Sequence, residues 1–186
     1  MKRRLVQTGS LKKTVFFDRD GTLIVNQHYL NDPELIVWLP NVFEALQLLR
    51  DHGFQFVMVT NQSGIAKGIV SVENMHEIHR RMLEKFKEHA IEFAGIYFSP
   101  HASNSDHEMR KPNPGMLLQA GRDLGIDFSQ SWMVGDNMSD VEAGRRAGCR
   151  NVLLAGGTDL AEGSKFAKPE VEAHDLLEAA KEMIRV

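Results

Sequence analysis

The 186-residue sequence has little of what secreted, membrane-bound or zinc-cluster proteins contain. Its single cysteine, Cys149, cannot form an internal disulfide, and one thiolate excludes a cysteine-built zinc cluster within one chain. No apolar run approaches the roughly 20 residues that cross a bilayer, and no signal-peptide core follows the basic start. These absences predict a cytoplasmic protein in a reducing compartment, with no membrane partner.

An excess of positive charge is also missing. The chain has 22 Lys and Arg residues against 25 Asp and Glu residues, a net charge of −3, so no chain-wide positive field attracts nucleic acid. The cations between Lys2 and Lys13 are more typical of a frayed, solvated terminus than of a nucleic-acid arm. With 42% hydrophobic and 25% charged residues, residues 1–186 are expected to form one globular, monomeric domain with a frayed segment 1–13.

Short apolar runs that stop at polar or glycine-rich loops predict buried strands. These runs are residues 14–17, 54–59, 96–98, 132–134 and 151–154. Helical periodicity between them, with an N-cap at Ser71 and stops at Gly53 and Gly125, predicts helices. The predicted helices cover residues 42–49, 71–86, 114–125, 138–147 and 175–184.

Strands that alternate with helices predict a three-layer, Rossmann-like α/β domain with a mainly parallel sheet and right-handed crossovers. In such sheets ligands bind beyond the carboxyl ends of the strands. All the polar loops should therefore converge on one edge of the sheet. The stretch 158–169 has little periodicity and predicts a loop before the last helix.

One predicted helix carries two histidines. Its apolar stripe is formed by Val72, Met75, Ile78, Met82, Leu83 and Phe86. His79 borders this stripe and His76, three residues earlier, faces away from it. Structural roles are therefore expected for both histidines.

Two carboxylates follow the first predicted strand directly. Asp18 and Asp20 repel each other in a tight loop, so a divalent cation, a shared proton or an opposing charge is expected beside them. The same pair also occurs in solvated turns. Its position after a four-residue apolar run, 14–17, favours catalysis over that alternative.

Three more polar sites follow later elements. Thr60 offers a hydroxyl to a phosphate-like anion, and Arg110 and Lys111 supply two cations before a helix. Asp136 and Asp140 are four residues apart, so they share a face if a helix begins there at once. Asp140 is equally typical of a first-turn acid that accepts hydrogen bonds from helix N–H groups, and both roles stay open.

This order of motifs resembles the haloacid-dehalogenase-like (HAD) phosphohydrolase superfamily, in which Asp-x-Asp-Gly-Thr is followed by Ser or Thr, then Lys, then an acidic metal loop. The resemblance covers roughly residues 15–154. Longer matches are similar to the branch of D,D-heptose 1,7-bisphosphate and histidinol-phosphate phosphatases. They are FDRDGT at 17–22, TNQSGIAKG at 60–68, RKPNPGM at 110–116 and VGD at 134–136.

The resemblance implies hydrolysis of a phosphomonoester through an aspartyl-phosphate intermediate. In that mechanism Asp18 attacks phosphorus, and Asp20 protonates the departing alkoxide and then deprotonates water. Lys111 is the point charge on the transferred phosphoryl group, and the Thr60 hydroxyl lies beside it.

The resemblance also implies Mg²⁺ as cofactor. The metal would be bound by the Asp18 carboxylate, the backbone carbonyl of Asp20 and Asp136, with Asp140 orienting metal waters or Lys111 from further out. The residues expected to contact substrate are Asn26, Gln27, His28, Tyr29, Asn61, Gln62, Ser63, Arg110 and Asn137.

Heptose-bisphosphate phosphatases usually carry a zinc loop, Cys-x-His then Cys-x-Cys, just before the Arg-Lys-Pro. The corresponding positions in this chain are Ser99, His101, His107 and Met109. With Asp106 and Glu108 the two histidines offer donor atoms for a metal. We nevertheless expect a loop without zinc, held by packing and hydrogen bonds.

The spacing of the motifs leaves no room for a separate cap domain, so an open site is expected. The predicted substrate is a small phosphorylated sugar, most simply the 7-phosphate of D-glycero-D-manno-heptose 1,7-bisphosphate, and loops 26–29 and 99–110 should discriminate among esters. Three alternatives remain: a histidinol-phosphate phosphatase, a DNA 3′-phosphatase and a catalytically silent binding module. The acidic charge balance disfavours the DNA enzyme.

Overall fold

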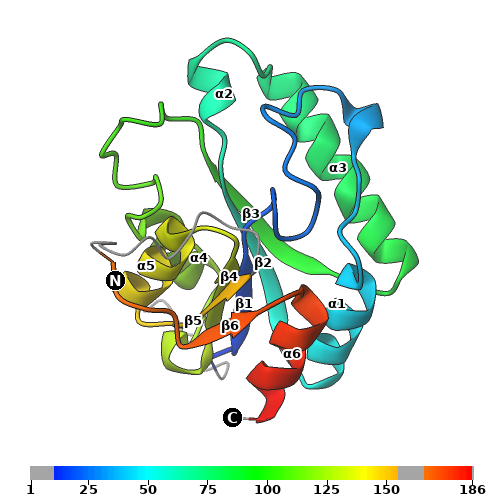
Figure 1. Cartoon of the computed structure of the whole chain (residues 1–186), viewed down its shortest axis with the longest axis vertical. Helices are drawn as coiled ribbons and strands as arrows, with labels where there is room; N and C mark the ends of the chain where they lie inside the picture. The colour runs from blue at the N-terminus through cyan, green and yellow to red at the C-terminus, as the bar shows by residue number, and fades with distance from the viewer. Residues whose placement is uncertain (1–10, 155–165, 186) are drawn as a thin grey trace, which may run out of the picture.

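The computed structural model describes residues 11–154 and 166–185. In these ranges six parallel strands form a sheet in the order β3-β2-β1-β4-β5-β6 (Figure 1). The strands are β1 Thr14–Phe17, β2 Gln55–Asn61, β3 Phe93–Ser99, β4 Trp132–Gly135, β5 Arg150–Leu154 and β6 Val171–Ala173. The central β1 pairs with β2 on one side and β4 on the other, with Val15 in register with Phe56 and Trp132.

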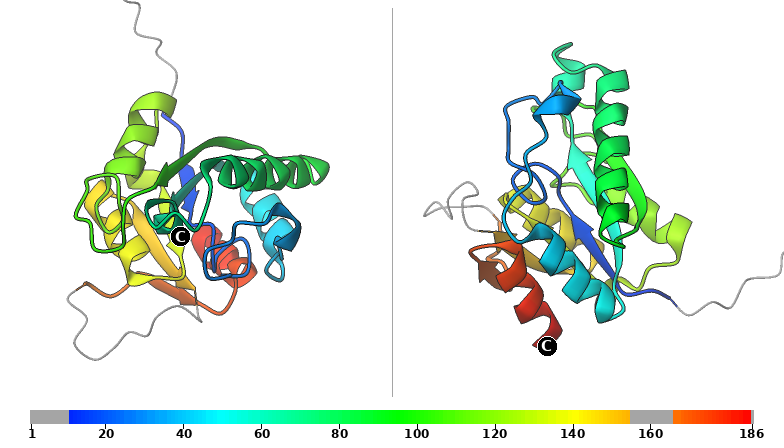
Figure 2. Two further views of the ribbon diagram at one scale, coloured as in Figure 1. Left: turned by 90° about the horizontal axis from the view of Figure 1, so that it is seen from above. Right: turned by 90° about the vertical axis from the view of Figure 1, so that its right-hand side faces the viewer.

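Helices cover both faces of the sheet (Figure 2). They are α1 Val42–Asp51, α2 Ser63–Ala66, α3 Val72–Glu88, α4 Gly115–Leu124, α5 Met138–Ala147 and α6 Leu176–Arg185, with short 3₁₀ turns at Pro33–Leu35 and Phe128–Gln130. Because side chains alternate along a strand, Val15 and Phe17 pack with α1, α3 and α6. Phe16 points the other way and packs with α4 and α5.

The predicted α/β architecture is therefore confirmed. The described chain between the strands contains helices and short loops and no separate cap domain. None of the helices in the described ranges has the length and apolar character needed to span a bilayer. The first ten residues of the predicted frayed segment and most of the predicted loop 158–169 lie outside the described residues; Lys12 already pairs with Ile126.

Element boundaries follow local signals closely where those signals are strong. The first strand and α5 begin and end as predicted, and α5 is bounded by an Asn137 capping box and by Gly148 with a φ of 88°. The short elements α2 and β6 were not predicted. The predicted apolar stripe of α3 is wrong at two positions, since Val72 is 40% exposed and Leu83 37% exposed.

Candidate active site

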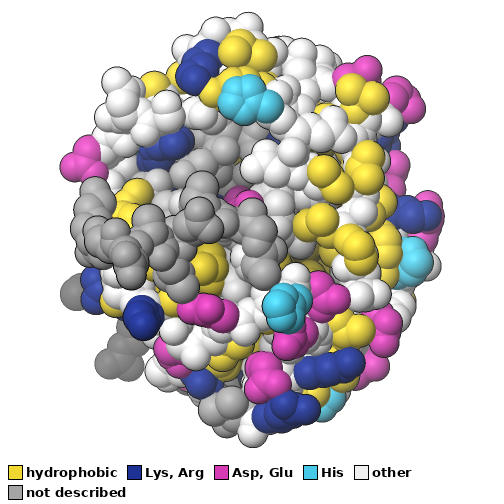
Figure 3. All heavy atoms as spheres, viewed as in Figure 1, with side chains coloured by type: hydrophobic (Ala, Val, Ile, Leu, Met, Phe, Trp, Pro, Cys, Tyr) yellow, Lys and Arg dark blue, Asp and Glu magenta, His cyan; other side chains and the backbone are white. Residues whose placement is uncertain are grey.

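The loops that follow β1, β2 and β4 meet Arg110 and Lys111 around one cavity at the carboxyl edge of the sheet. The loop expected after residue 154 lies outside the described residues. The cavity has a volume of about 450 Å³ and lies where the strand order reverses, between β1 and β4. Charged side chains of both signs are visible in the hollow in the upper half of the molecule (Figure 3). The residues predicted for the site line this cavity, except Thr60, which is buried and hydrogen-bonded to Gln62.

The loop after β1 is a tight turn that places Asp18. The backbone N–H of Asp18 donates to the carbonyl of Val134 at 3.0 Å and so connects the loop to β4. Gly21 follows with a φ of 79°, and a Cβ on this residue would lie 2.0 Å from Oδ2 of Asp136. Glycine is therefore required both for the backbone conformation and for the approach of the Asp136 carboxylate.

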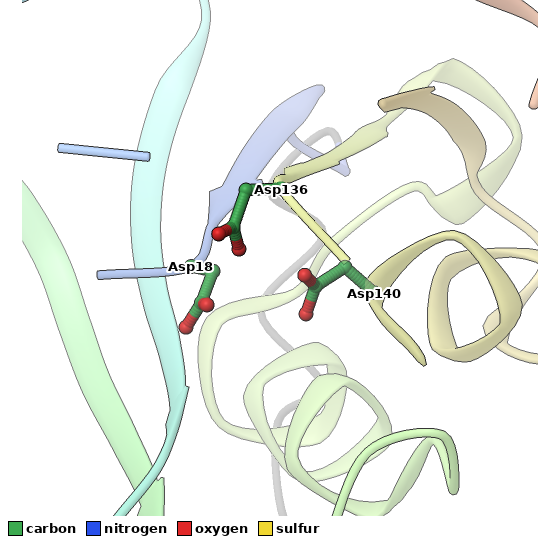
Figure 4. Close-up of side chains that lie close together, drawn as sticks. All are labelled: Asp18, Asp136 and Asp140. Atoms are coloured by element: carbon green, nitrogen blue, oxygen red, sulfur yellow. The ribbon is translucent and has the colours of Figure 1, made fainter. Parts of the chain in front are cut away.

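Three carboxylates converge on a common space between the ends of β1 and β4 and the start of α5 (Figure 4). One oxygen each of Asp18, Asp136 and Asp140 lies within 4.8 Å of the others. Lys111 enters the cluster with its Nζ 2.9 Å from Asp18 Oδ1 and 2.6 Å from Asp140 Oδ1. The ammonium also donates to the carbonyl of Val59 at 2.8 Å, and the residue is only 3% exposed.

Burial and crowding of like charges shift the titration of this cluster. Burial, with the neighbouring Asp18 charge, raises the pKa of Asp136 to about 6. Burial raises the pKa of Asp140 to about 7, against the opposing effect of Lys111. Burial alone would lower the pKa of Lys111, but Asp140 and Asp18 outweigh it and the pKa is raised. The lysine is therefore charged at neutral pH.

The donor set fits a magnesium ion. Three carboxylates share a single lysine, so the cluster is short of positive charge, and it offers the oxygen ligands that Mg²⁺ prefers. Asp140 is already engaged, with Oδ1 on Lys111 and Oδ2 accepting from the Asn137 backbone N–H at 3.1 Å. Asp18 and Asp136 are half-buried at the cavity wall. They are the two side chains that would hold the metal.

Asp20 lies beside this cluster, in a hydrogen-bonded setting of its own. The Arg19 guanidinium donates from Nε to Oδ2 and from Nη2 to Oδ1, each at 3.1 Å. Gln62 Nε2 donates to Oδ2 at 3.0 Å. Burial raises the pKa of Asp20, and the adjacent Arg19 charge opposes that rise.

The residues at the end of β2 and directly after it hold other parts of the site in place. Asn61 pairs with the backbone of Lys111, donating to its carbonyl at 3.1 Å and accepting from its N–H at 3.2 Å. Gln62 donates to the hydroxyl oxygen of Thr60 at 2.8 Å. Both amides were predicted to contact substrate, and both make these protein contacts while lining the cavity. Ser63 lines it at the start of α2.

Two loops border the cavity, residues 26–29 and 101–110, and are called the rim below. In the first loop the rings of His28 and Tyr29 lie 4.2 Å apart. Lys67, outside the rim, donates to the Tyr29 hydroxyl, and its Nζ lies 4.8 Å from the ring centroid. Aromatic and polar groups thus face the opening from this side.

The second rim loop is anchored by backbone and amide contacts. The Arg110 guanidinium donates to the carbonyl of His101 at 3.1 Å. Asn113, just past the loop, donates to the carbonyl of His107 at 3.2 Å and accepts from Arg146 at 2.9 Å. Arg110 also lines the cavity wall.

The four positions that match the zinc loop do not line the cavity. The His101 and His107 rings stack with centroids 3.6 Å apart. His107 Nδ1 accepts from the backbone N–H of Met109 at 3.1 Å, and Ser99 is buried. Over the described residues, the group of three close metal-ligating side chains is the aspartate cluster, not this loop.

Sequence reasoning missed Arg19, which lines the cavity, and His79, which reaches the site only through Arg19. Arg19 is only 1% exposed and donates from Nη1 toward His79 Nε2 at 3.3 Å. Its position between two acids, directly after a buried strand, was the available signal. His79 was predicted to be structural, and no local pattern marks its link to a residue 60 positions away.

Comparison with known proteins gives concordant matches. A family model described as HAD-hydrolase-like matches residues 108–179. A D-glycero-beta-D-manno-heptose-1,7-bisphosphate 7-phosphatase from Pasteurella multocida is 38% identical over 162 residues, covering 83% of this chain and 88% of that protein. Its counterpart from Haemophilus influenzae is 39% identical over 154 residues, covering 79% of this chain and 84% of that protein.

A solved structure agrees with these sequence matches. It is the D,D-heptose 1,7-bisphosphate phosphatase of B. bronchiseptica in complex with magnesium and phosphate. The two folds superpose with a TM-score of 0.84 at 27% identity, covering 93% of this chain and 98% of that one. That relative therefore has magnesium and phosphate bound on the same fold.

Proposed function

The chain belongs to the HAD-like D-glycero-β-D-manno-heptose-1,7-bisphosphate 7-phosphatase family, and we propose that it removes the 7-phosphate of this sugar bisphosphate with Mg²⁺ as cofactor. The observation that carries the proposal is the convergence of Asp18, Asp136 and Lys111 on one cavity. A nucleophile, an oxygen-rich cation site and a fixed positive charge are what phosphoryl transfer requires.

In the first half-reaction Asp18 attacks phosphorus in line. A bond forms between its carboxylate oxygen and phosphorus as the bond from phosphorus to the sugar oxygen breaks. Asp20 donates its proton to that departing oxygen, a role that its raised pKa supports. Lys111 stabilises the negative charge on the transferred group. Asp18 and Asp136 would hold the magnesium ion, which would supply further positive charge to shield the nucleophile from the phosphate.

In the second half-reaction Asp20 is the base. It takes a proton from water, whose oxygen attacks the phosphorus of the aspartyl-phosphate and releases inorganic phosphate and the Asp18 carboxylate. The rim is proposed to select the ester. Arg110, with its bidentate fork at the cavity wall, would bind the second phosphate of the sugar. Thr60, Asn61, Gln62 and Asn137 would act mainly by holding the neighbouring groups in place.

Replacement of Asp18 by Asn tests the chemistry. The variant should lose on the order of 10⁴-fold or more in turnover of both the heptose bisphosphate and an aryl phosphate, with an unchanged circular dichroism spectrum. Acid-quenched wild type should carry covalent phosphate on Asp18, and the variant none. Undiminished turnover in the variant would exclude the covalent mechanism.

A substrate panel tests the ester separately. Heptose 1,7-bisphosphate should have the highest kcat/KM, ahead of histidinol phosphate and a 3′-phosphorylated oligonucleotide. A higher kcat/KM for either competitor would overturn the sugar assignment and leave the phosphatase chemistry standing. The expected monomeric, cytoplasmic state stays a prediction, for which sedimentation velocity and cell fractionation are the measurements.

A further inference from the structure

A buried arginine sits between the two acids of the nucleophile loop. Arg19 holds both oxygens of Asp20 through the Nε and Nη2 edge of its guanidinium, with each bond 3.1 Å long. A paired fork of this kind fixes the plane of a carboxylate, which a single hydrogen bond does not. A guanidinium that is 1% exposed must also find partners for its other N–H groups.

Two side chains from other elements supply those partners. Arg19 Nη2 donates to Oε1 of Gln62, the residue that follows β2, at 3.1 Å. Nη1 lies 3.3 Å from Nε2 of His79, on α3. Gln62 also contacts Asp20 directly, since its Nε2 donates to Asp20 Oδ2 at 3.0 Å. The guanidinium is therefore held from two sides while it holds Asp20.

His79 is suited to accept this hydrogen bond. It is 5% exposed on the inner side of α3. Burial, together with the Arg19 charge, lowers its pKa to about 3, so the imidazole is neutral at physiological pH. An unprotonated Nε2 presents a lone pair toward Arg19 Nη1. The aromatic edge of Phe98 borders the ring on another side, with centroids 6.5 Å apart.

We infer that His79 is a positioning residue that acts on the acid–base Asp20 through Arg19. The inference rests on the proposed function, in which Asp20 protonates the leaving oxygen. His79 does not line the cavity and contacts no reacting atom. Its part is to fix the Arg19 fork, and with it the direction in which the Asp20 carboxyl group points.

The choice of leaving group separates this role from a merely structural one. A sugar alkoxide leaves only with a proton, whereas a nitrophenolate leaves without one. A misdirected Asp20 should therefore slow cleavage of the sugar phosphate and spare that of p-nitrophenyl phosphate. The comparison uses kcat/KM, because this ratio covers the steps up to leaving-group release and excludes the later hydrolysis of the phosphoenzyme.

The test variants are His79→Leu, which removes the acceptor, and His79→Gln, which restores one. Loss of a hydrogen bond to a charged group predicts a roughly 10-fold fall in kcat/KM of His79→Leu for the heptose bisphosphate and about twofold or less for p-nitrophenyl phosphate. His79→Gln should recover most of the loss. The matched control is His76→Leu, one turn away on the exposed side of α3. This variant should keep the wild-type kcat/KM for both substrates.

An equal fall on both substrates in His79→Leu, or no recovery in His79→Gln, would overturn the inference. If His79→Leu does not fold, Arg19→Lys serves instead, since one ammonium cannot bridge both Asp20 oxygens and His79. The same selective loss is expected there, and an equal loss overturns the inference.

One readout does not depend on activity. The ¹⁵N spectrum of His79 in the wild type should show an unprotonated Nε2 at neutral pH, with a resonance that moves in Arg19→Lys. A protonated Nε2, or one indifferent to Arg19, would refute the positioning role even in an active enzyme. A wild type that cleaves no phosphate ester while His79 shows the expected spectrum would instead refute the proposed function.

Discussion

The floor and the rim of the cavity are built in different ways. The floor consists of Asp18, Asp20, Lys111, Asp136 and Asp140. Its aspartates follow the ends of β1 and β4, and Lys111 is ion-paired with Asp18 and Asp140. All five side chains are buried or half-buried among close partners. The rim consists of loops with exposed side chains such as Asn26 and His28. Its anchors run mostly to backbone carbonyls.

This difference separates chemistry from recognition. The sheet fixes the floor before any ligand arrives, so changes there should alter kcat. Loops with few contacts tolerate change, so substitutions in the rim should alter KM and the choice of ester.

The largest effect should follow removal of the metal. Without a cation at Asp18 and Asp136 the floor keeps three carboxylates against one lysine, and turnover after EDTA treatment should fall below detection. Added Mg²⁺ should restore it. Phosphate release measures the activity, and elemental analysis confirms that the protein is metal-free. Full turnover in protein proven free of metal would contradict the assignment of the floor.

A pair of glycines offers a matched test of how closely the floor is fixed. Gly21 and Gly68 have similar φ values of 79° and 68°, so alanine strains the backbone by about 1–2 kcal/mol at either position. At Gly21 the new Cβ also meets Asp136 Oδ2 at 2.0 Å, whereas nothing lies within 4 Å at Gly68. Displacement of Asp136 should lower kcat of Gly21→Ala by roughly 100-fold.

Gly68→Ala should lose stability in urea unfolding and keep its kcat. The two variants thus share the strain and differ in the clash. If both lose kcat alike, backbone strain explains the loss, and the position of Asp136 does not.

Arg110 tests the rim directly. Loss of a hydrogen-bonded charge that contacts the substrate equally in ground and transition states should raise KM of Arg110→Ala for the bisphosphate by about 10-fold and leave kcat within about twofold. The effect should vanish with a heptose 7-monophosphate. Arg122→Ala, on the exposed side of α4, is the control. A main effect on kcat would show that Arg110 takes part in the chemistry, as the floor residues do, and would contradict its assignment to ester recognition.

The elements that place the floor are also the ones that the sequence predicts best. Strand β1 and the acids after it were predictable because a four-residue apolar run and the loop that ends it are local patterns. Helix α5 was predictable from both ends, where Asn137 caps it and Gly148 stops it. These are the elements that place the floor.

What could not be predicted depends on contacts between distant segments. A buried Arg19 is unexpected from composition, because arginine is seldom buried without partners, and its partner His79 lies 60 residues away. Strand β6 has only three residues, Val171–Ala173, and owes its conformation to pairing with β5. The clamp between Asn61 and the Lys111 backbone likewise exists only in the folded sheet.

The smallest effect concerns the far anchor of the rim. Arg146 bridges Glu142 at 2.7 Å and Asn113 at 2.9 Å, so Glu142 reaches the second rim loop through two side chains. Hydrogen bonds from Arg145, opposed by burial and aided by Arg146, lower the pKa of Glu142 from 4.5 to about 2. A carboxylate with a lowered folded-state pKa stabilises the protein above its unfolded pKa and loses that contribution as pH falls.

Glu142→Gln should therefore be less stable than wild type at neutral pH, by at most about 1 kcal/mol because both arginines are partly exposed. The difference should shrink between pH 4.5 and about 2, where the wild-type carboxylate takes up its proton. Urea unfolding across that range measures it, and a difference independent of pH would exclude the ion pair as its source. Since only the rim anchor is loosened, KM should rise slightly while kcat stays unchanged.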